Sequence, residues 1–317
     1  MFQLLATHPI HPTGMKLLQE EAVVHILSEK TPEKLREEAQ EKDGVINRIG
    51  KITRELIEEN PQFKFIGQLG VGIDSIDMQA ATEQGIPVVY APGTNAETVS
   101  EHIIALLLAL AKDLKQADLN LRRDNWNYRD QVTSMDIKGK TLGIVGYGSI
   151  GKEVAKKADA LGLKLIAYSR SQGDFGPCTP VDSLNDLFRQ ADFVSLSVPS
   201  NEETKDLVGI EQLKLLGEKG YIINCARGPV LNQDDLTLAL KSKIIAGAAV
   251  DVYSTEPPHL GDELFQMENL IATPHMAALT NDCFQRMSVL LAQGILGVLR
   301  GDFPYNIANR DALMRNY

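Results

Sequence analysis

Residues 140–151 have the sequence KTLGIVGYGSIG, and this stretch decides the fold of the chain. An apolar run, Thr141–Val145, enters it, and an amphipathic segment, Ile150–Leu161, leaves it. A second apolar run, Lys164–Tyr168, follows. Three glycines alone are a weak signal, but the order strand, glycine-rich turn, helix and strand is the context of a dinucleotide-binding βαβ unit. The stretch therefore predicts a Rossmann-like cofactor domain.

The three glycines have separate roles in such a unit. The first permits the tight turn, the second lets a pyrophosphate approach the backbone, and the third lets the helix pack close to the strand. The amides at the helix N-terminus then bind the anion. A structural βα turn without ligand is the alternative. The residues expected to contact the cofactor here are Gly146, Tyr147, Gly148, Ser149, Ile150 and Gly151.

The end of the second strand indicates which nicotinamide cofactor is bound. A site that prefers NAD places Asp or Glu there to accept hydrogen bonds from the ribose hydroxyls. This chain has Ser169, Arg170 and Ser171 instead. Two hydroxyls and a guanidinium can bind a 2′-phosphate, and no carboxylate repels it. We therefore expect NADP rather than NAD. The alternative is that Arg170 only faces solvent and that either cofactor is accepted.

Short apolar runs alternate with amphipathic segments along the whole chain. This βα rhythm predicts parallel sheets covered by helices. In the first third we expect strands at Gln3–Thr7, Val23–Leu27, Gly44–Ile49, Phe63–Leu69 and Pro87–Tyr90. In the second series we expect them at Thr141–Val145, Lys164–Tyr168, Phe193–Val198, Tyr221–Cys225, Ala246–Val252 and Leu270–Ala272.

Two long helical patterns, Glu97–Arg123 and Ala278–Arg300, bracket the second series. The chain would leave a first domain through one helix and return to it through the other. We therefore expect an α/β protein with two Rossmann-like, doubly wound parallel-sheet domains, of which the discontinuous one is flavodoxin-like. The expected substrate domain comprises residues 1–97 and 285–317, and the expected dinucleotide-binding domain comprises residues 98–284.

Three polar residues near the ends of later strands suit the reduction of a 2-keto acid. Arg227 can bind a carboxylate with its guanidinium fork and polarise the adjacent carbonyl. His275 can act as general acid, and Glu256 can keep its imidazole charged. Taken singly, each has an ordinary structural interpretation as a turn arginine, a helix-start histidine or a loop carboxylate. The other five of the six histidines are interpreted in that structural way.

Composition and charge exclude several other classes of protein. The 317 residues are 44% hydrophobic and 23% charged, with a formal net charge of −10. That charge repels phosphate backbones and anionic lipid, so nucleic acid and membrane are not expected partners. Three separated cysteines offer no metal site and favour a reducing compartment, for which the cytoplasm is the default. An anionic substrate would need local cations in order to bind.

Six motifs in order resemble the family of D-isomer-specific 2-hydroxyacid dehydrogenases. This family includes phosphoglycerate dehydrogenase and the glyoxylate/hydroxypyruvate reductases, and the likeness extends from Gly44 to Ile307. The motifs are Gly-Val-Gly-Ile-Asp-Ser-Ile-Asp at 70–77, the glycine fingerprint at 146–151, Val-Pro-Ser-Asn-Glu-Glu-Thr at 198–204, Asn-Cys-Ala-Arg-Gly at 224–228, Asp-Val-Tyr-Ser-Thr-Glu-Pro at 251–257 and Thr-Pro-His at 273–275.

The resemblance implies roles for individual residues. Arg227 would orient the substrate, His275 would be the acid/base and Glu256 would support it. The backbone amides of Val71 and Gly72 would bind the substrate carboxylate. The nicotinamide carboxamide would be held by Asp251. The cofactor would also be lined by Thr98, Val198, Pro199, Thr204, Cys225 and Ala226. Family members pair through the cofactor domain, so a homodimer is expected.

The resemblance leaves the substrate open. Asn47-Arg48-Ile49 is similar to the segment of phosphoglycerate dehydrogenases whose arginine meets the substrate phosphate, whereas Arg48 could equally contact a smaller acid. The Ser169–Arg170 pair looks more like the NADP-using reductases. We favour a glyoxylate/hydroxypyruvate-type reductase, with D-3-phosphoglycerate dehydrogenase as the alternative. A further alternative is a cofactor-sensing binding protein, because the family's fold also serves transcriptional corepressors.

Overall fold

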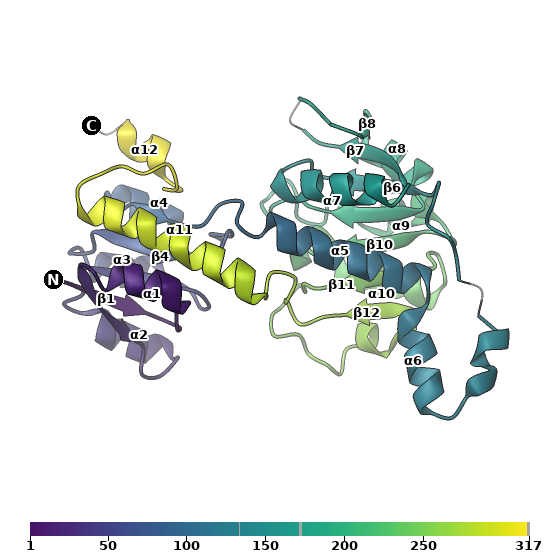
Figure 1. Ribbon diagram of the computed structural model, residues 1–317, viewed down its shortest axis with the longest axis horizontal. Coiled ribbons are helices and arrows are strands. Elements are labelled where there is room, and N and C mark those ends of the chain that lie inside the picture. The colour runs from purple at the N-terminus through teal and green to yellow at the C-terminus, as the bar shows by residue number, and fades with distance from the viewer. Residues whose placement is uncertain (133, 171–172, 316–317) are drawn as a thin grey trace. The chain divides into compact units, whose positions relative to one another are not determined.

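The chain folds into two compact α/β units. The computed structural model describes residues 1–132, 134–170 and 173–315. The first unit comprises Met1–Asn95 together with Leu279–Tyr317, and the second comprises Ala96–Ala278 (Figure 1). Within the described residues, no helix has both the length and the apolar composition needed to span a bilayer.

The first unit is built on a parallel sheet. Over its described residues the sheet has five strands in the order β2-β1-β3-β4-β5. The strands are β1 (Phe2–Ala6), β2 (Ala22–Ile26), β3 (Gly44–Asn47), β4 (Phe65–Gln68) and β5 (Val88–Val89). From β1 the chain first adds β2 on one side of the sheet and then adds β3, β4 and β5 on the other side. This change of direction between β1 and β3 is that of flavodoxin-like folds, so the prediction for this unit is confirmed. Loops that follow neighbouring strands therefore meet at one edge of the sheet.

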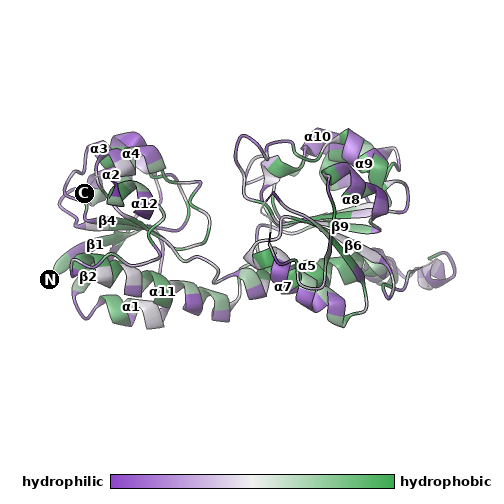
Figure 2. Ribbon diagram, turned by 90° about the horizontal axis from the view of Figure 1, so that it is seen from above, coloured by the Kyte–Doolittle hydropathy of each residue, from purple (hydrophilic) through white to green (hydrophobic). Residues whose placement is uncertain are grey.

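Helices cover both faces of this sheet (Figure 2). They are α1 (Pro12–Leu18), α2 (Pro32–Ala39), α3 (Arg54–Glu58), α4 (Met78–Glu83), α11 (Asn281–Leu299) and α12 (Arg310–Met314). Thr31, Thr53 and Asp77 start α2, α3 and α4, because each side chain accepts a hydrogen bond from a backbone amide of the first turn. Gly14 lets α1 approach α11 closely, since a Cβ there would lie 2.6 Å from the carbonyl oxygen of Ser288.

The second unit is also built on a parallel sheet. Across the ranges that the structure describes, the sheet has seven strands in the order β12-β11-β10-β9-β6-β7-β8. The strands are β6 (Thr141–Val145), β7 (Lys164–Tyr168), β8 (Thr179–Pro180), β9 (Phe193–Leu196), β10 (Tyr221–Asn224), β11 (Gly247–Val250) and β12 (Leu270–Ala272). The order reverses between β6 and β9, which is the Rossmann switch point where ligands bind. The predicted doubly wound fold is confirmed, and only the two-residue edge strand β8 was not expected.

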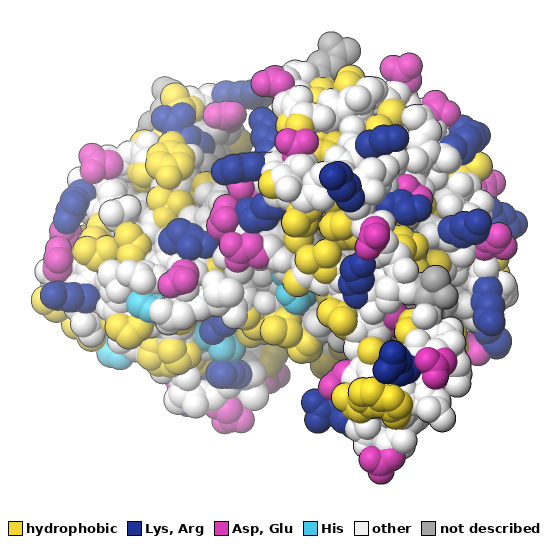
Figure 3. Space-filling view, turned by 45° about the vertical axis from the view of Figure 1, so that its right-hand side comes forward, with side chains coloured by type: hydrophobic (Ala, Val, Ile, Leu, Met, Phe, Trp, Pro, Cys, Tyr) yellow, Lys and Arg dark blue, Asp and Glu magenta, His cyan; other side chains and the backbone are white. Residues whose placement is uncertain are grey.

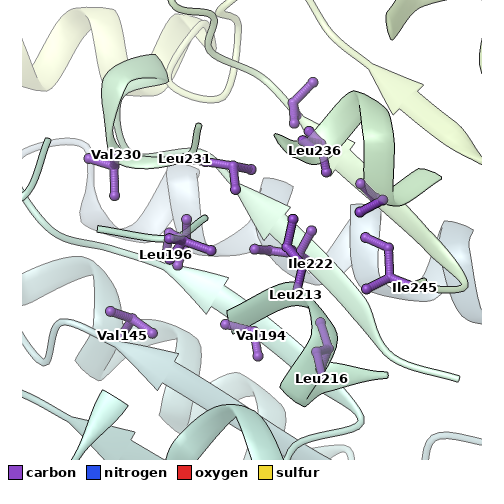
Figure 4. Packing of buried hydrophobic residues seen from close by; sticks show 14 of the residues in the cluster. Val145, Val194, Leu196, Leu213, Leu216, Ile222, Val230, Leu231, Leu236 and Ile245 are labelled. Atoms are coloured by element: carbon purple, nitrogen blue, oxygen red, sulfur yellow. The ribbon is translucent and has the colours of Figure 1, made fainter. Parts of the chain in front are cut away.

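Helices also lie on both faces of the second sheet, with α5 and α7 on one side and α8, α9 and α10 on the other (Figure 2). Figure 4 shows the core on the latter side, where Val194 and Ile222 of the sheet lie with Leu213 and Leu216 of α9. Burying each such side chain contributes about 1.5–3 kcal/mol. The helical segments are α5 (Ala96–Ala111), α6 (Leu114–Arg122), η1 (Trp126–Asp130), α7 (Ser149–Ala160), α8 (Leu184–Gln190), α9 (Ile210–Leu216), η2 (Gly228–Val230), α10 (Gln233–Lys241) and η3 (Glu263–Gln266).

The prediction of one helix over Glu97–Arg123 is wrong. Helix α5 ends at Ala111, and Asp113 has a left-handed φ of 50° before α6 begins. Aspartate is one of the few residues that adopt this conformation, and here its carboxylate accepts a hydrogen bond from the Tyr128 hydroxyl. The break lets α6 leave the sheet, so that α6 and η1, which are described throughout, contain no buried residue.

Candidate active site

The glycine-rich turn between β6 and α7 has the local geometry of a pyrophosphate site. Gly146 has a φ of +94°, and a Cβ there would lie 2.6 Å from the carbonyl oxygen of Ser197. A Cβ at Gly151 would lie 2.2 Å from the carbonyl oxygen of Gly146. By contrast, no described atom lies within 4 Å of a Cβ built at Gly148. Gly148 is also the N-cap of α7 and brings no side chain to its amides, which leaves them for an anion.

The side chain of Tyr147 packs on the protein and not over this turn. Its ring stacks on Phe175, with the ring centroids 5.1 Å apart, and its hydroxyl is hydrogen-bonded to Cys178. Burial raises the pKa of Tyr147 to about 12 and that of Cys178 to about 11, so both groups stay protonated near neutral pH. Tyr147 therefore offers a cofactor its backbone, together with the neighbouring Ser149 and Ile150.

The end of β7 lies beside the glycine-rich turn, because the amide of Gly146 donates to the carbonyl of Tyr168 over 2.8 Å. Ser169 is half-buried there, and the Arg170 side chain is 61% exposed. Arg170 forms an ion pair with Glu203, which the sequence analysis did not foresee. Ser171 lies outside the described residues. The Glu203 carboxylate, from a remote segment, thus lies next to Arg170, the cation predicted to bind the 2′-phosphate.

The other residues expected around the cofactor have different exposures. Val198 and Pro199 follow β9, the strand next to β6, and are accessible. Thr204 is buried, and its hydroxyl donates to the Pro199 carbonyl over 2.7 Å, so this side chain holds the shape of the loop. Thr98 on α5 is also buried, as are Cys225 and Ala226 after β10. Contact of these residues with a cofactor stays a prediction.

His275 and Glu256 form a close pair at the carboxyl ends of β12 and β11. The His275 Nδ1 atom lies 2.6 Å from the Glu256 Oε2 atom. The other carboxylate oxygen of Glu256 accepts the backbone amide of Tyr253 over 3.1 Å, which fixes its orientation. The side chains of His275 and Glu256 remain 51% and 36% exposed. This arrangement orients the imidazole and leaves its Nε2 atom for proton transfer to a ligand.

Arg227 lies in the turn after β10, next to the loops of this pair. The Asn224 side chain braces the turn by donating to the Arg227 carbonyl over 3.1 Å and accepting the Ala226 amide over 3.0 Å. A Cβ at Gly228 would lie 1.8 Å from the carbonyl oxygen of Tyr253, so only glycine allows the two loops to meet. The Arg227 guanidinium donates to the Ala226 carbonyl over 2.8 Å and is half-buried. The second unit therefore brings Arg227, Glu256 and His275 to adjacent strand ends.

Asp251 is almost fully buried, with 1% of its surface exposed. Its carboxylate accepts hydrogen bonds from the Thr273 hydroxyl and from the backbone amides of Met276 and Ala277. The side chain predicted to hold the nicotinamide carboxamide is thus also bound to the loop that carries His275. Contact of Asp251 with a cofactor stays a prediction.

The remaining predicted residues belong to the first unit. Arg48 follows β3, and Val71 and Gly72 follow the neighbouring strand β4, so the three lie at the same edge of the sheet. The Arg48 guanidinium stacks over the Phe284 ring of α11 at 5.0 Å. This contact holds the guanidinium at the sheet edge, and the Phe284 ring shields one face of it from water. Among the described residues, no cluster of His, Cys, Asp and Glu is arranged to hold a metal ion.

Comparison with known protein families identifies the chain. Residues 104–277 match the family model described as D-isomer specific 2-hydroxyacid dehydrogenase, NAD binding domain. The chain belongs to this family. The resemblance predicted from the six motifs is confirmed.

Two of the similar relatives carry different names. The chain is 37% identical over 314 residues to D-3-phosphoglycerate dehydrogenase of Methanocaldococcus jannaschii, covering 98% of this chain and 60% of that protein. It is 34% identical over 326 residues to glyoxylate reductase of Thermococcus litoralis, covering 98% of both. It thus spans about 60% of the length of the first relative and nearly all of the second.

Solved structures agree with the fold. A protein of Thermus thermophilus superposes with a TM-score of 0.91 at 30% identity, over 96% of this chain and 99% of the other. The NADPH-dependent glyoxylate/hydroxypyruvate reductase of Sinorhizobium meliloti superposes with a TM-score of 0.85 at 26% identity, over 94% and 95%. The doubly wound architecture is therefore that of dehydrogenases in this family.

Proposed function

We propose that this protein reduces a small 2-keto acid, such as glyoxylate or hydroxypyruvate, to the corresponding 2-hydroxy acid, with NADPH as the preferred cofactor. The observation that carries the proposal is the 2.6 Å pair between His275 and Glu256, set on adjacent strand ends with Arg227. In this proposal the second unit is the dinucleotide-binding domain, predicted as residues 98–284. The first unit is the substrate domain, predicted as residues 1–97 and 285–317.

The chemistry divides between the cofactor and three side chains. A nicotinamide cofactor, when bound, would supply the hydride that reduction of the carbonyl carbon requires. His275 then gives the proton from its Nε2 atom to the carbonyl oxygen, which completes the hydroxyl group. Glu256 accepts the Nδ1–H of the imidazole and stabilises its charged form before the transfer. After turnover, solvent returns the proton to His275, because its side chain is 51% exposed.

Arg227 and the first unit supply the electrostatic part of the proposal. The Arg227 guanidinium pairs with the substrate carboxylate and polarises the adjacent carbonyl, so that charge developing on the oxygen is stabilised. Within the first unit, the Val71 and Gly72 amides and the Arg48 guanidinium are the groups proposed to bind an anionic substrate. Such local cations are needed because the chain as a whole carries a net charge of −10.

The cofactor preference rests on the end of β7. Ser169 and Arg170 occupy the place where NAD-preferring relatives of the Rossmann type have a carboxylate. Because the Arg170–Glu203 ion pair is exposed on both sides, at 61% and 69%, it is weak, and a 2′-phosphate with two charges can displace Glu203. We therefore propose NADPH as the preferred reductant, with NADH accepted less well.

Replacing Arg170 tests this preference. The Arg170→Ala variant should raise KM for NADPH about tenfold and change KM for NADH by less than about twofold, because only the phosphate loses its cation. Steady-state kinetics with both cofactors measure the ratio. Glu203→Gln is the matched variant, and it should lower KM for NADPH because it removes the competing carboxylate. Equal effects of Arg170→Ala on both cofactors would rule out the phosphate contact.

D-3-phosphoglycerate dehydrogenase is the second candidate, and a pocket in the first unit favours it. This pocket measures about 440 Å³, and its lining includes His8, Lys30, Arg36 and Lys51 against the single carboxylate of Glu33. Burial, followed by the charges of Lys30 and Arg48, lowers the pKa of His8. A second anionic group on the substrate would find compensating charge there.

A substrate panel decides between the two candidates. Glyoxylate, hydroxypyruvate and 3-phosphohydroxypyruvate are each assayed with NADPH and with NADH. The proposal expects the highest kcat/KM for an unphosphorylated acid with NADPH. A preference above tenfold for the phosphorylated acid would establish the second candidate instead. If none of the three acids is reduced with either cofactor, both proposals are overturned and a cofactor-sensing binding protein is favoured.

We also propose a homodimer paired through the second unit. Helix α6 and η1 project from this unit, and hydrophobic side chains are visible on the projection in Figure 3. Leu114, Leu121 and Trp126 expose 54%, 57% and 64% of their surface. Several exposed hydrophobic side chains on one projecting segment are typical of an interface between subunits.

The mass in solution tests the pairing. Light scattering after size exclusion should give about twice the chain mass of 34.8 kDa. The double variant Leu121→Asp and Trp126→Asp should shift the protein to the monomer mass, because two charges would be buried at the interface. Leu260→Asp is the matched control, since Leu260 is 72% exposed on another loop. A wild-type monomer at micromolar concentration would contradict the proposal.

A further inference from the structure

A hydrogen-bonded chain links helix α5 to the loop that carries His275. The Thr273 hydroxyl lies 2.5 Å from the Asp251 Oδ1 atom. The His102 Nε2 atom, from α5, lies 3.2 Å from the same hydroxyl and 3.8 Å from the Asp251 Oδ1 atom. His102 is outside all six family motifs, and neither His102 nor Thr273 has a role in the reaction described above. Both contacts lie entirely within the second unit.

The donors and acceptors of this chain can be assigned. A threonine hydroxyl has one proton, and the short distance to a buried carboxylate places that proton toward Asp251. The hydroxyl oxygen is then an acceptor for His102, so the His102 Nε2 atom carries the hydrogen. His102 is thus the first donor in a series of two hydrogen bonds, from His102 to Thr273 and from Thr273 to the Asp251 carboxylate. Its side chain is only 19% exposed, which keeps the contact largely out of water.

The carboxylate at the end of this chain organises the backbone around His275. The Asp251 Oδ1 atom accepts the Met276 amide over 2.9 Å, and the Oδ2 atom accepts the Ala277 amide over 2.8 Å. The Asp251 backbone carbonyl accepts the His275 amide over 2.8 Å. Groups on both sides of His275 are therefore held by one residue. Removing any donor would leave a buried charge with fewer partners, which is costly.

The loop needs this support because His275 has a left-handed φ of 49°. Few non-glycine residues adopt this conformation, and although histidine tolerates it better than most, it is stable only with support from the surroundings. With the backbone held so, the imidazole meets Glu256 at 2.6 Å. A small relaxation toward ordinary backbone angles would rotate the imidazole away from that carboxylate and from the ligand.

We propose that His102 and Thr273 are positioning residues, which act through Asp251 to hold the His275 imidazole in its reactive orientation. The proposal rests on the acid/base role of His275. It assigns to α5, which otherwise packs against the sheet and α7, a direct part in the geometry of the reaction. Asp251 is also the residue predicted to hold the nicotinamide carboxamide, but the substitutions tested below leave Asp251 in place. We therefore expect the main effect on proton transfer at His275 and only a small effect on cofactor affinity.

Paired substitutions at two positions test the proposal. Thr273→Val keeps the shape and removes the hydroxyl, whereas Thr273→Ser keeps the hydroxyl. His102→Leu removes the donor, whereas His102→Gln keeps an N–H group at the same reach. We expect Thr273→Val and His102→Leu to lower kcat about tenfold and to raise the solvent deuterium isotope effect, with cofactor affinity within about twofold. Thr273→Ser and His102→Gln should restore most of the turnover.

Controls separate a positioning role from loss of structure. Thr237→Val removes a hydroxyl that bonds only within α10, and His25→Leu removes an exposed histidine that contacts Gln3, so both should turn over as wild type. Titration of NADPH fluorescence shows whether each variant is folded and binds cofactor. If kcat and cofactor affinity fall together, the His102–Thr273–Asp251 hydrogen bonds serve cofactor binding, and the proposal is overturned. Normal kcat in Thr273→Val and His102→Leu would also overturn it.

The His275→Ala variant distinguishes this inference from the proposed function. If His275→Ala turns over normally, the acid/base role itself is wrong, and the function proposed for the site fails with it. If His275→Ala is inactive while Thr273→Val and His102→Leu are normal, only the positioning role fails. Wild-type activity toward a 2-keto acid is measured first, so that each variant has a reference.

Discussion

The His275→Ala variant is expected to lose about 100- to 10,000-fold in kcat, which is the range that a positioned general acid contributes. Reduction of a keto acid leaves negative charge on the carbonyl oxygen unless a proton arrives during the hydride transfer. In the proposed function, the His275 imidazole, whose Nδ1 atom lies 2.6 Å from Glu256, delivers that proton. Cofactor affinity should change little, because the glycine-rich turn lies at other strand ends. Steady-state kinetics and fluorescence titration with NADPH measure the two effects separately.

A second histidine in the same unit provides a matched control. His259 also pairs with a carboxylate, that of Asp262 at 3.1 Å, but its side chain is 83% exposed and has no proposed role. His259→Ala should therefore leave kcat within about twofold of wild type. The kcat of Glu256→Gln should lie between those of His275→Ala and His259→Ala. The amide oxygen of the glutamine still accepts the Nδ1–H of His275 but carries no negative charge. A His275→Ala enzyme with more than a tenth of wild-type kcat would remove His275 from the acid role.

The site could be predicted from the sequence because its parts are short contiguous motifs at strand ends. Parallel strands with adjacent carboxyl ends bring Arg227, Glu256 and His275 together without any information about side-chain packing. The glycine fingerprint is equally local in sequence, since its three glycines lie in one βα turn at 146–151, although the close approach at Gly146 comes from Ser197 of another segment. The apolar strands also gave clear signals, because strands buried on both faces appear as continuous hydrophobic runs.

Features that depend on contacts between distant segments could not be predicted in this way. The break at Asp113 depends on a left-handed residue bound by Tyr128, and the apolar pattern continues across it. Glu203 meets Arg170 from a separate loop, so the carboxylate absent from the end of β7 is supplied from elsewhere. His102 contacts Thr273 across 171 positions of sequence. An isolated histidine within an apolar helix carries no local signal of that contact.

The Arg227→Ala variant is expected to lower kcat/KM for the keto acid about 100- to 1,000-fold, in the range found when one oxyanion-stabilising donor is removed. Two effects combine in this loss. The carboxylate of the substrate loses its paired cation, which raises KM, and the carbonyl oxygen loses a stabilising charge as hydride adds, which lowers kcat. Arg227→Lys should recover only part of the loss, because an ammonium cannot form the two parallel hydrogen bonds of a guanidinium. Steady-state kinetics of both variants separate the two parameters.

Chemical rescue distinguishes this role of Arg227 from a structural one. Guanidinium ion added at millimolar concentration should restore part of the turnover of Arg227→Ala, since the vacated space is bordered by the braced turn of Asn224 and Gly228. It should not help Arg189→Ala, whose side chain pairs with Asp186 on the exposed face of α8 and which should turn over as wild type without it. If Arg227→Ala raises KM alone, the guanidinium binds the substrate equally in its ground and transition states. Such a result would limit Arg227 to holding the carboxylate and leave polarisation of the carbonyl to another group.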